Sequence, residues 1–156
     1  MGETMQTNSR FYVSALGPIY ETLDPYALPL LRIAMGLILI PHGCQKLFGW
    51  FHGLGFQGFT QLFDKLGYHP GALYTVIAGT IELVGGICLV LGLATRAWSL
   101  LLVIFMVFGA QFTSQKGFFW TQGGAEYSLL ILVVGLVFLI HGGGKWSLDR
   151  MMGREL

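Results

Sequence analysis

Charged side chains are scarce in this chain: Asp, Glu, Lys and Arg make up 11% of its 156 residues, while hydrophobic residues make up 54%. A soluble globular domain usually carries about 25% charged residues, so much of this surface does not face water. The formal net charge is only +1, which provides no basic field to attract nucleic acid. The composition therefore favours a single domain in a lipid bilayer and no nucleic-acid partner.

Several familiar sequence signals are missing as well. The segment from Gly53 to Gly58 spells G-x-G-x-x-G, but it follows an apolar run and lacks the strand and the later acidic residue of a dinucleotide site. There is no C-x-x-C pair and no His, Cys, Asp or Glu cluster with metal-ligand spacing. The mixed, polar N-terminus does not resemble a cleaved signal peptide. The sequence thus contains no recognisable cofactor or metal motif.

Four apolar runs are each long enough to cross about 30 Å of hydrocarbon as a helix. They predict an all-α, polytopic membrane protein with four transmembrane helices in a bundle spanning residues 27–145. We expect residues 1–26 to form a cytoplasmic N-terminal segment and residues 146–156 a cytoplasmic C-terminal tail. The predicted spans are residues 27–48, 72–92, 96–115 and 126–143.

The basic residues at the ends of these spans predict the orientation. Five of them flank one side and three flank the other, so both termini are expected in the cytoplasm. The five are Arg10, Arg96, Lys145, Arg150 and Arg154, and the three are Lys46, Lys65 and Lys116.

The first outer loop is predicted to contain a short interfacial helix, because Phe56, Phe59, Phe63 and Leu66 recur at helical spacing.

The two cysteines are not expected to form a disulfide. Cys44 is predicted near the outer end of the first span and Cys88 near the inner end of the second. Counting residues along the helices separates them by about 18 Å along the membrane normal, whereas a disulfide needs Cα atoms within about 7 Å.

Ionisable residues inside the predicted spans are costly in hydrocarbon, so they usually face the bundle interior and indicate function. Arg32, His42 and Lys46 lie on one stripe of the first span. Glu82 lies near the middle of the second. By residue count, His42 shares a level with Gln111 of the third span, and Lys46 shares the next level outward with Glu126 of the fourth. These positions are Arg32, His42, Lys46, Glu82, Gln111 and Glu126.

The heights predict a polar pocket that opens outward with Glu82 at its floor. A carboxylate at the middle of the bilayer needs a partner or must be protonated, and either His42 from above or Arg32 from below could serve. We favour His42, because Arg32 is close enough to the inner boundary to snorkel. Lys46 and Glu126 could form an interfacial salt bridge that fixes helix packing.

The segment His42-Gly43-Cys44-Gln45-Lys46-Leu47-Phe48 resembles the H-G-x-x-K-L-F pattern of the DoxX family of bacterial membrane proteins. Further blocks agree with the family in order and spacing, so the resemblance covers the chain from about Leu30 to Arg150. These blocks are Gly58-Phe59, Ile81-Glu82-Leu83-Val84-Gly85-Gly86, Gly117-Phe118-Phe119, Gly124-Ala125-Glu126-Tyr127 and Trp146-Ser147-Leu148-Asp149.

The resemblance implies a four-helix protein of the bacterial inner membrane, with His42, Lys46, Glu82 and Glu126 at family-pattern positions. Many relatives have a histidine shortly before the G-F-F block, where this chain has Gln111, Thr113 and Gln115 instead. The family name comes from an association with a thiosulfate:quinone oxidoreductase. Relatives are also linked to oxidative-stress or detoxification complexes.

Three functions remain open from the sequence, and so does whether the chain is itself an enzyme. The first is a redox-associated membrane subunit whose pocket binds a quinone headgroup or a small anion, with electrons supplied by a protein partner. The second is a non-enzymatic scaffold or assembly subunit, and the third is a small-molecule permease acting as a homo-oligomer. In the first, the catalytic candidates are Glu82 and His42, and the ligand-binding candidates are Lys46, Gln111, Glu126 and Arg32.

Overall fold

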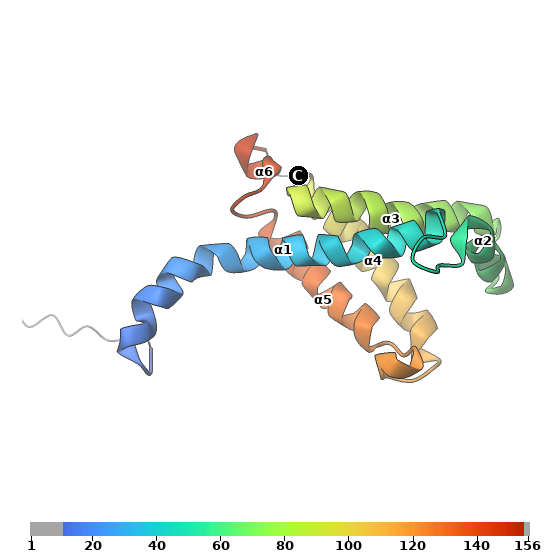
Figure 1. Cartoon of the computed structure of the whole chain (residues 1–156), viewed down its shortest axis with the longest axis horizontal. Coiled ribbons are helices and arrows are strands. Elements are labelled where there is room, and N and C mark those ends of the chain that lie inside the picture. The colour runs from blue at the N-terminus through green and yellow to red at the C-terminus, as the bar shows by residue number, and fades with distance from the viewer. Residues whose placement is uncertain (1–10, 155–156) are drawn as a thin grey trace, which may run out of the picture.

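The computed structural model describes residues 11–154 of the chain. Over this range every regular element is a helix and there is no strand, which confirms the all-α prediction (Figure 1). The elements in chain order are η1 (Ser14–Leu16), α1 (Gly17–Leu47), α2 (Gly55–Lys65), α3 (Gly71–Leu91), α4 (Thr95–Ser114), η2 (Trp120–Gln122), α5 (Glu126–His141) and α6 (Leu148–Met151).

Three of the described segments are long and apolar enough to cross a bilayer. They are Ser14–Leu47, which contains η1 and α1, then α3 and α4. The fourth apolar helix, α5, has only 16 residues. At 1.5 Å per residue it extends about 24 Å, somewhat less than the hydrocarbon thickness of about 30 Å. The structure therefore provides three candidate spans and one shorter apolar helix.

The first helix begins ten residues before the span expected from hydropathy. Its first turn tolerates Pro18, because an N–H at that position has no partner inside the helix. Pro25 and Pro29 lie further along it and cannot donate backbone hydrogen bonds. Toward its N-terminal end α1 bends away from the other helices (Figure 1), as prolines inside a helix would cause.

Helices α1 and α3 approach each other at glycines. A Cβ added to Gly36 would lie 2.5 Å from the carbonyl oxygen of Gly86, and one added to Gly43 would lie 2.5 Å from the backbone nitrogen of Leu83. In the other direction, Gly79 of α3 lies directly beneath the side chain of Leu47. Small residues allow this close backbone contact in lipid, where the hydrophobic effect does not hold helices together.

The helices pack in a row in which α1 contacts α3, α3 contacts α4 and α4 contacts α5. The interior contains the buried residues Met35, Leu39, Ile81, Leu89, Leu102, Met106, Ile131 and Phe138. Toward the end of the molecule that carries α2 and η2, the α4–α5 hairpin diverges from α1 and α3 (Figure 1). At the opposite end the four helices converge near α6, so the bundle is wedge-shaped.

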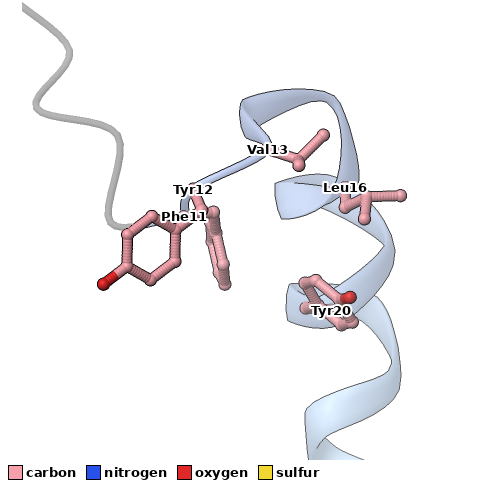
Figure 2. A pocket seen from close by; sticks show the side chains of 5 residues that line it. All are labelled: Phe11, Tyr12, Val13, Leu16 and Tyr20. Carbon is pink, nitrogen blue, oxygen red and sulfur yellow. The ribbon is translucent and has the colours of Figure 1, made fainter.

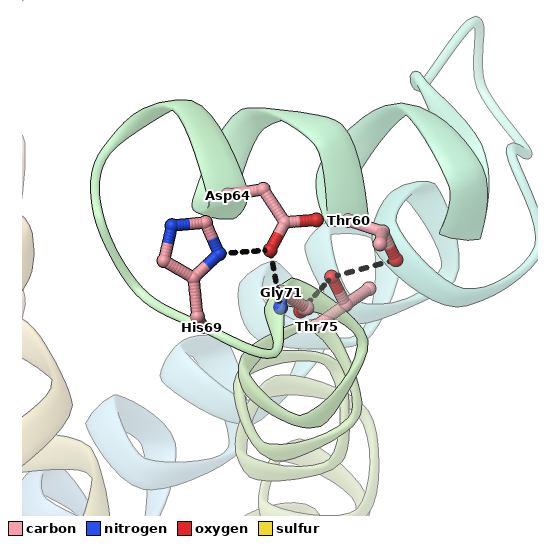
Figure 3. A network of polar contacts seen from close by, with 5 residues as sticks. All are labelled: Thr60, Asp64, His69, Gly71 and Thr75. Carbon is pink, nitrogen blue, oxygen red and sulfur yellow. Dashed lines mark hydrogen bonds and ion pairs between the residues drawn. The ribbon is translucent and has the colours of Figure 1, made fainter.

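Helix α2 packs against the start of α3 through polar contacts (Figure 3). One carboxylate oxygen of Asp64 accepts a hydrogen bond from the backbone N–H of Gly71 at 2.8 Å and lies 2.9 Å from Nδ1 of His69. The hydroxyls of Thr60 and Thr75 are 3.4 Å apart. An anionic side chain is favourable at a helix N-terminus, so Asp64 fixes the helix of the first loop onto α3.

The glycine contact predicts how the chain responds to a single methyl group. Gly43→Ala should lower the free energy of unfolding by about 1–3 kcal/mol, because the added Cβ overlaps backbone atoms that cannot move independently. The matched change Gly109→Ala adds a methyl whose nearest neighbour is 3.6 Å away, so it should be neutral or stabilising. Thermal unfolding of both purified variants in one detergent measures the difference, and equal midpoints would contradict the prediction.

Candidate functional site

The central polar contact of the bundle is an ion pair between α1 and α3. The ammonium of Lys46 lies 2.5 Å from a carboxylate oxygen of Glu82, and their side chains are only 14% and 6% exposed. Gly43 lies against Leu83, so Glu82 comes opposite the helical turn from His42 to Lys46. The ammonium also lies 5.2 Å from the ring centre of Phe59 on α2, a cation–π distance.

This pairing corrects two predictions about partners. Glu82 pairs with Lys46 and not with His42 or Arg32, and Lys46 does not bridge to Glu126. The carboxylate of Glu126 instead accepts a hydrogen bond from the backbone N–H of Trp120 at 3.1 Å. The predicted heights assumed that every helix starts and ends at the membrane boundary, whereas the glycine contacts set the register of α3 on α1 and place Glu82 beside Lys46.

A cavity of about 180 Å³ lies beside this pair, between the two halves of the wedge. His42 from α1 and Glu82 from α3 both line it, so the structure brings the two catalytic candidates together. The ring of His42 lies 6.2 Å from that of Tyr127 on α5, centre to centre. The complete lining is Leu39, His42, Glu82, Phe105, Met106, Gly109, Tyr127, Ser128 and Ile131.

The sequence interpretation missed Tyr127 and Ser128 as lining residues. Both belong to the first turn of α5, directly after Glu126, and Tyr127 is the last residue of one of the blocks that resemble the family. Neither side chain is ionisable and both lie at the start of an apolar run, so neither indicates by itself a polar group that is costly in hydrocarbon. Gln111, in contrast, is exposed and does not line the cavity, since it lies on the outer face of α4.

Arg32 lies at the other end of the bundle and serves a different purpose. From the sequence we expect Arg32 to snorkel to the membrane surface. Its side chain is instead fully buried. One terminal nitrogen donates to the carbonyl oxygens of Leu89 and, at 3.2 Å, Val90. The other donates to the carbonyl of Trp146 at 2.9 Å. Two of these carbonyls belong to the last turn of α3, where that of Leu89 also accepts the N–H of Gly92 at 3.2 Å, and the third belongs to the C-terminal segment.

Asp149, in the C-terminal segment, binds backbone groups in the same region as Arg32. Its two carboxylate oxygens accept hydrogen bonds from the backbone N–H groups of Ala94, at 2.6 Å, and Thr95, at 2.9 Å. Its own N–H donates to the carbonyl of Gly92 at 3.0 Å. The carboxylate therefore caps the N-terminus of α4, and the tail is fastened to the turn between α3 and α4. We call Arg32, Asp149 and the backbone groups that they bind the C-terminal clasp.

A second hollow, of about 230 Å³, lies at the start of α1 (Figure 2). Side chains from one short segment line it, and Tyr12 among them is fully exposed. None of the residues predicted to act in the site contributes to it. The lining residues are Phe11, Tyr12, Val13, Leu16 and Tyr20.

Cys44 and Cys88 are both free, as the distance argument predicted. Within residues 11–154, no three His, Cys, Asp or Glu side chains gather closely enough to hold a metal ion.

The ion pair predicts a large effect of removing one charge. Glu82→Gln should lower the free energy of unfolding on the order of 3–5 kcal/mol, because Lys46 would remain buried without a counter-charge. The double variant Lys46→Gln/Glu82→Gln should recover part of this loss, since neither charge is then buried alone. Glu126→Gln, whose carboxylate has only one backbone partner, is the control. Thermal unfolding in detergent checks this, and a double variant less stable than Glu82→Gln would contradict it.

The C-terminal clasp predicts a smaller, separate effect. Asp149→Asn keeps one oxygen acceptor and loses the other, leaving one buried N–H group of the α4 terminus unpaired at a cost of about 1–3 kcal/mol. Arg150→Gln changes the exposed neighbouring side chain and should have little effect. Limited proteolysis of the C-terminal segment reports the loss of the clasp directly. Equal cleavage rates in the two variants would argue against this role of Asp149.

The chain matches the DoxX family over residues 27–115. It is 30% identical to an uncharacterized membrane protein of Mycobacterium tuberculosis, with 84% of each chain covered. It is also 30% identical to "Putative oxidoreductase CatD" of Bacillus subtilis, over 77% of this chain and 82% of the relative.

The inner membrane protein YphA of Escherichia coli is 30% identical as well, over 81% of this chain and 90% of the relative. No solved structure matches significantly. The family match covers more than half of the residues and the relatives align along most of their length, so this chain is a membrane protein of the DoxX family.

Proposed function

We propose that this chain is a redox-associated subunit of the bacterial inner membrane, and that the cavity between its helices binds a small ligand, a quinone headgroup or a small anion. The observation that carries the proposal is the position of His42 and Glu82 on one open cavity beside a buried ion pair. Buried ionisable groups that line a cavity are the usual mark of function in membrane proteins.

The cavity residues have distinct roles in this proposal. The imidazole of His42 can both donate and accept a hydrogen bond, so it holds the ligand and relays a proton. Glu82 accepts that proton, and Lys46 acts through Glu82, because its ammonium is already bound to the carboxylate. Arg32, Gln111 and Glu126 lie outside the cavity lining and take no part in ligand binding.

The chain has no recognisable cofactor motif of its own, so electrons come from a protein partner. The relative CatD carries the word oxidoreductase in its name, which supports a redox context for this site. In the bilayer, α1, α3, α4 and α5 form four spans with both termini in the cytoplasm, and α2 lies at the outer interface.

A second candidate function is a non-enzymatic scaffold. The C-terminal clasp favours it, because Arg32 and Asp149 bind backbone groups at helix ends and in the tail, and buried ions of this kind serve packing. In that case the pair of Lys46 and Glu82 has the same structural purpose, and the cavity holds lipid.

The two functions are separated by what the protein carries when purified. We expect the wild-type chain, extracted in mild detergent, to retain a small ligand that mass spectrometry detects in its organic or aqueous extract. His42→Gln should lose this ligand, because the imidazole lines the cavity. His141→Gln, at the exposed far end of α5, is the matched control and should retain it.

Equal ligand content in the two histidine variants, or none in the wild-type protein, would overturn the proposal in favour of the scaffold. An absorption spectrum of the same samples records whether the retained ligand is a chromophore.

A further inference from the structure

The charges at the cavity decide between the two classes of ligand. An anion would need a cation that is free to pair with it, yet the nearest ammonium, that of Lys46, lies 2.5 Å from Glu82. Lys46 does not contribute to the lining, whereas the carboxylate of Glu82 does. An anion in the cavity would therefore meet a negative group first and would lose its hydration without a counter-charge.

The side chains that line the cavity are mostly apolar and would suit an apolar ring. Aliphatic, aromatic and thioether side chains form most of the surface, and polar groups are concentrated on α1, α3 and the first turn of α5. An apolar cavity of about 150 Å³ holds one benzene molecule, so about 180 Å³ is sufficient for a substituted ring. The apolar wall residues are Leu39, Phe105, Met106 and Ile131.

We infer where this cavity opens from the packing of the helices. Helices α1 and α5 are the two ends of the packed row, and they do not pack closely against each other. His42 and Tyr127 face each other across this gap, and Tyr127 is 38% exposed. One turn inward from them, Ile38 on α1 and Leu130 on α5 are exposed apolar residues. The rim of the opening is therefore apolar, as expected for a surface that faces lipid.

We propose that the cavity takes an uncharged, lipid-dissolved ring compound, which enters sideways from the bilayer between α1 and α5 past His42 and Tyr127. This inference rests on the proposed function, because it uses the same cavity, and it excludes the small anion from the two ligand classes. An apolar tail on the ligand remains in the lipid between the two helices, while polar edges of the ring receive hydrogen bonds from His42 and the hydroxyls of Tyr127 or Ser128.

Two probes with the same ring test the class of ligand and its route. One is a benzoquinone with a decyl chain, which is uncharged and dissolves in the bilayer. The other is a benzoquinone sulfonate, which is charged and stays in water. Binding of each to the full chain in nanodiscs is measured by titration, corrected for partition into empty nanodiscs. We expect the decyl probe to bind and the sulfonate to leave its binding unchanged when added in excess.

Gly109 allows the cavity to be filled without disturbing the fold. A Cβ at this position would lie 3.6 Å from the hydroxyl of Ser128 and 3.9 Å from the sulfur of Met106, both ordinary contacts. Gly109→Ala and Gly109→Val should weaken binding of the decyl probe, the valine variant on the order of tenfold. Ala110→Val adds bulk one residue further along α4, outside the lining, and should bind like the wild type.

The outcomes separate the inference from the proposed function. If the sulfonate binds and Gly109→Val abolishes that binding, the cavity is a ligand site but the uncharged class and the lateral route are wrong. If the decyl probe binds equally to Gly109→Val and Ala110→Val, its site lies elsewhere and the inference fails. Gly109→Ala, expected to fold at least as well as the wild type, keeps the test decisive should the valine variant not fold.

Discussion

The close approach of α1 and α3 at their glycines is the constraint on which the rest of this structure depends. Lipid tails are as apolar as the helix surfaces, so helices associate in a bilayer through close packing and interhelical polar contacts. Gly36 and Gly43 bring the two backbones together and thereby fix their register. In that register Lys46 faces Glu82, and two charges that would be costly alone in hydrocarbon become a pair.

The two ends of the bundle use buried polar residues for opposite purposes. At the end near α6, Arg32 binds carbonyls of the last turn of α3 and of the tail, and Asp149 binds N–H groups at the start of α4, so the helices converge and the tail is held. At the end that carries α2, α4 and α5 diverge from α1 and α3 (Figure 1). The contact between Lys46 and Glu82 there joins side chains beside a cavity, which is where chemistry can take place.

Counting residues along the helices predicted where the helices lie better than it predicted which side chains contact each other. It placed His42 and Glu82 near the same pocket, because both are ionisable residues inside apolar runs, with Glu82 near the middle of its run and below His42 by residue count. It gave the wrong partner for Glu82 and placed Gln111 inside, because height along a helix says nothing about which face is turned inward. The hydrogen bonds of Arg32 were also missed, since its acceptors are backbone carbonyls of residues 57 or more positions away in the sequence.

The sequence by itself determined that the chain is all-helical and belongs in a membrane. The length and hydropathy of each apolar run decide whether it can cross the hydrocarbon, and both are properties of the local sequence. The blocks around His42, Glu82 and Asp149 also identified the family. Only the tertiary structure decided which charges meet, that the C-terminal segment is fastened to the turn between α3 and α4, and that a cavity lined by His42, Glu82 and Tyr127 lies among α1, α3, α4 and α5. Those features follow from the rotation and register of each helix on its neighbour, which the close contacts of glycines set in three dimensions.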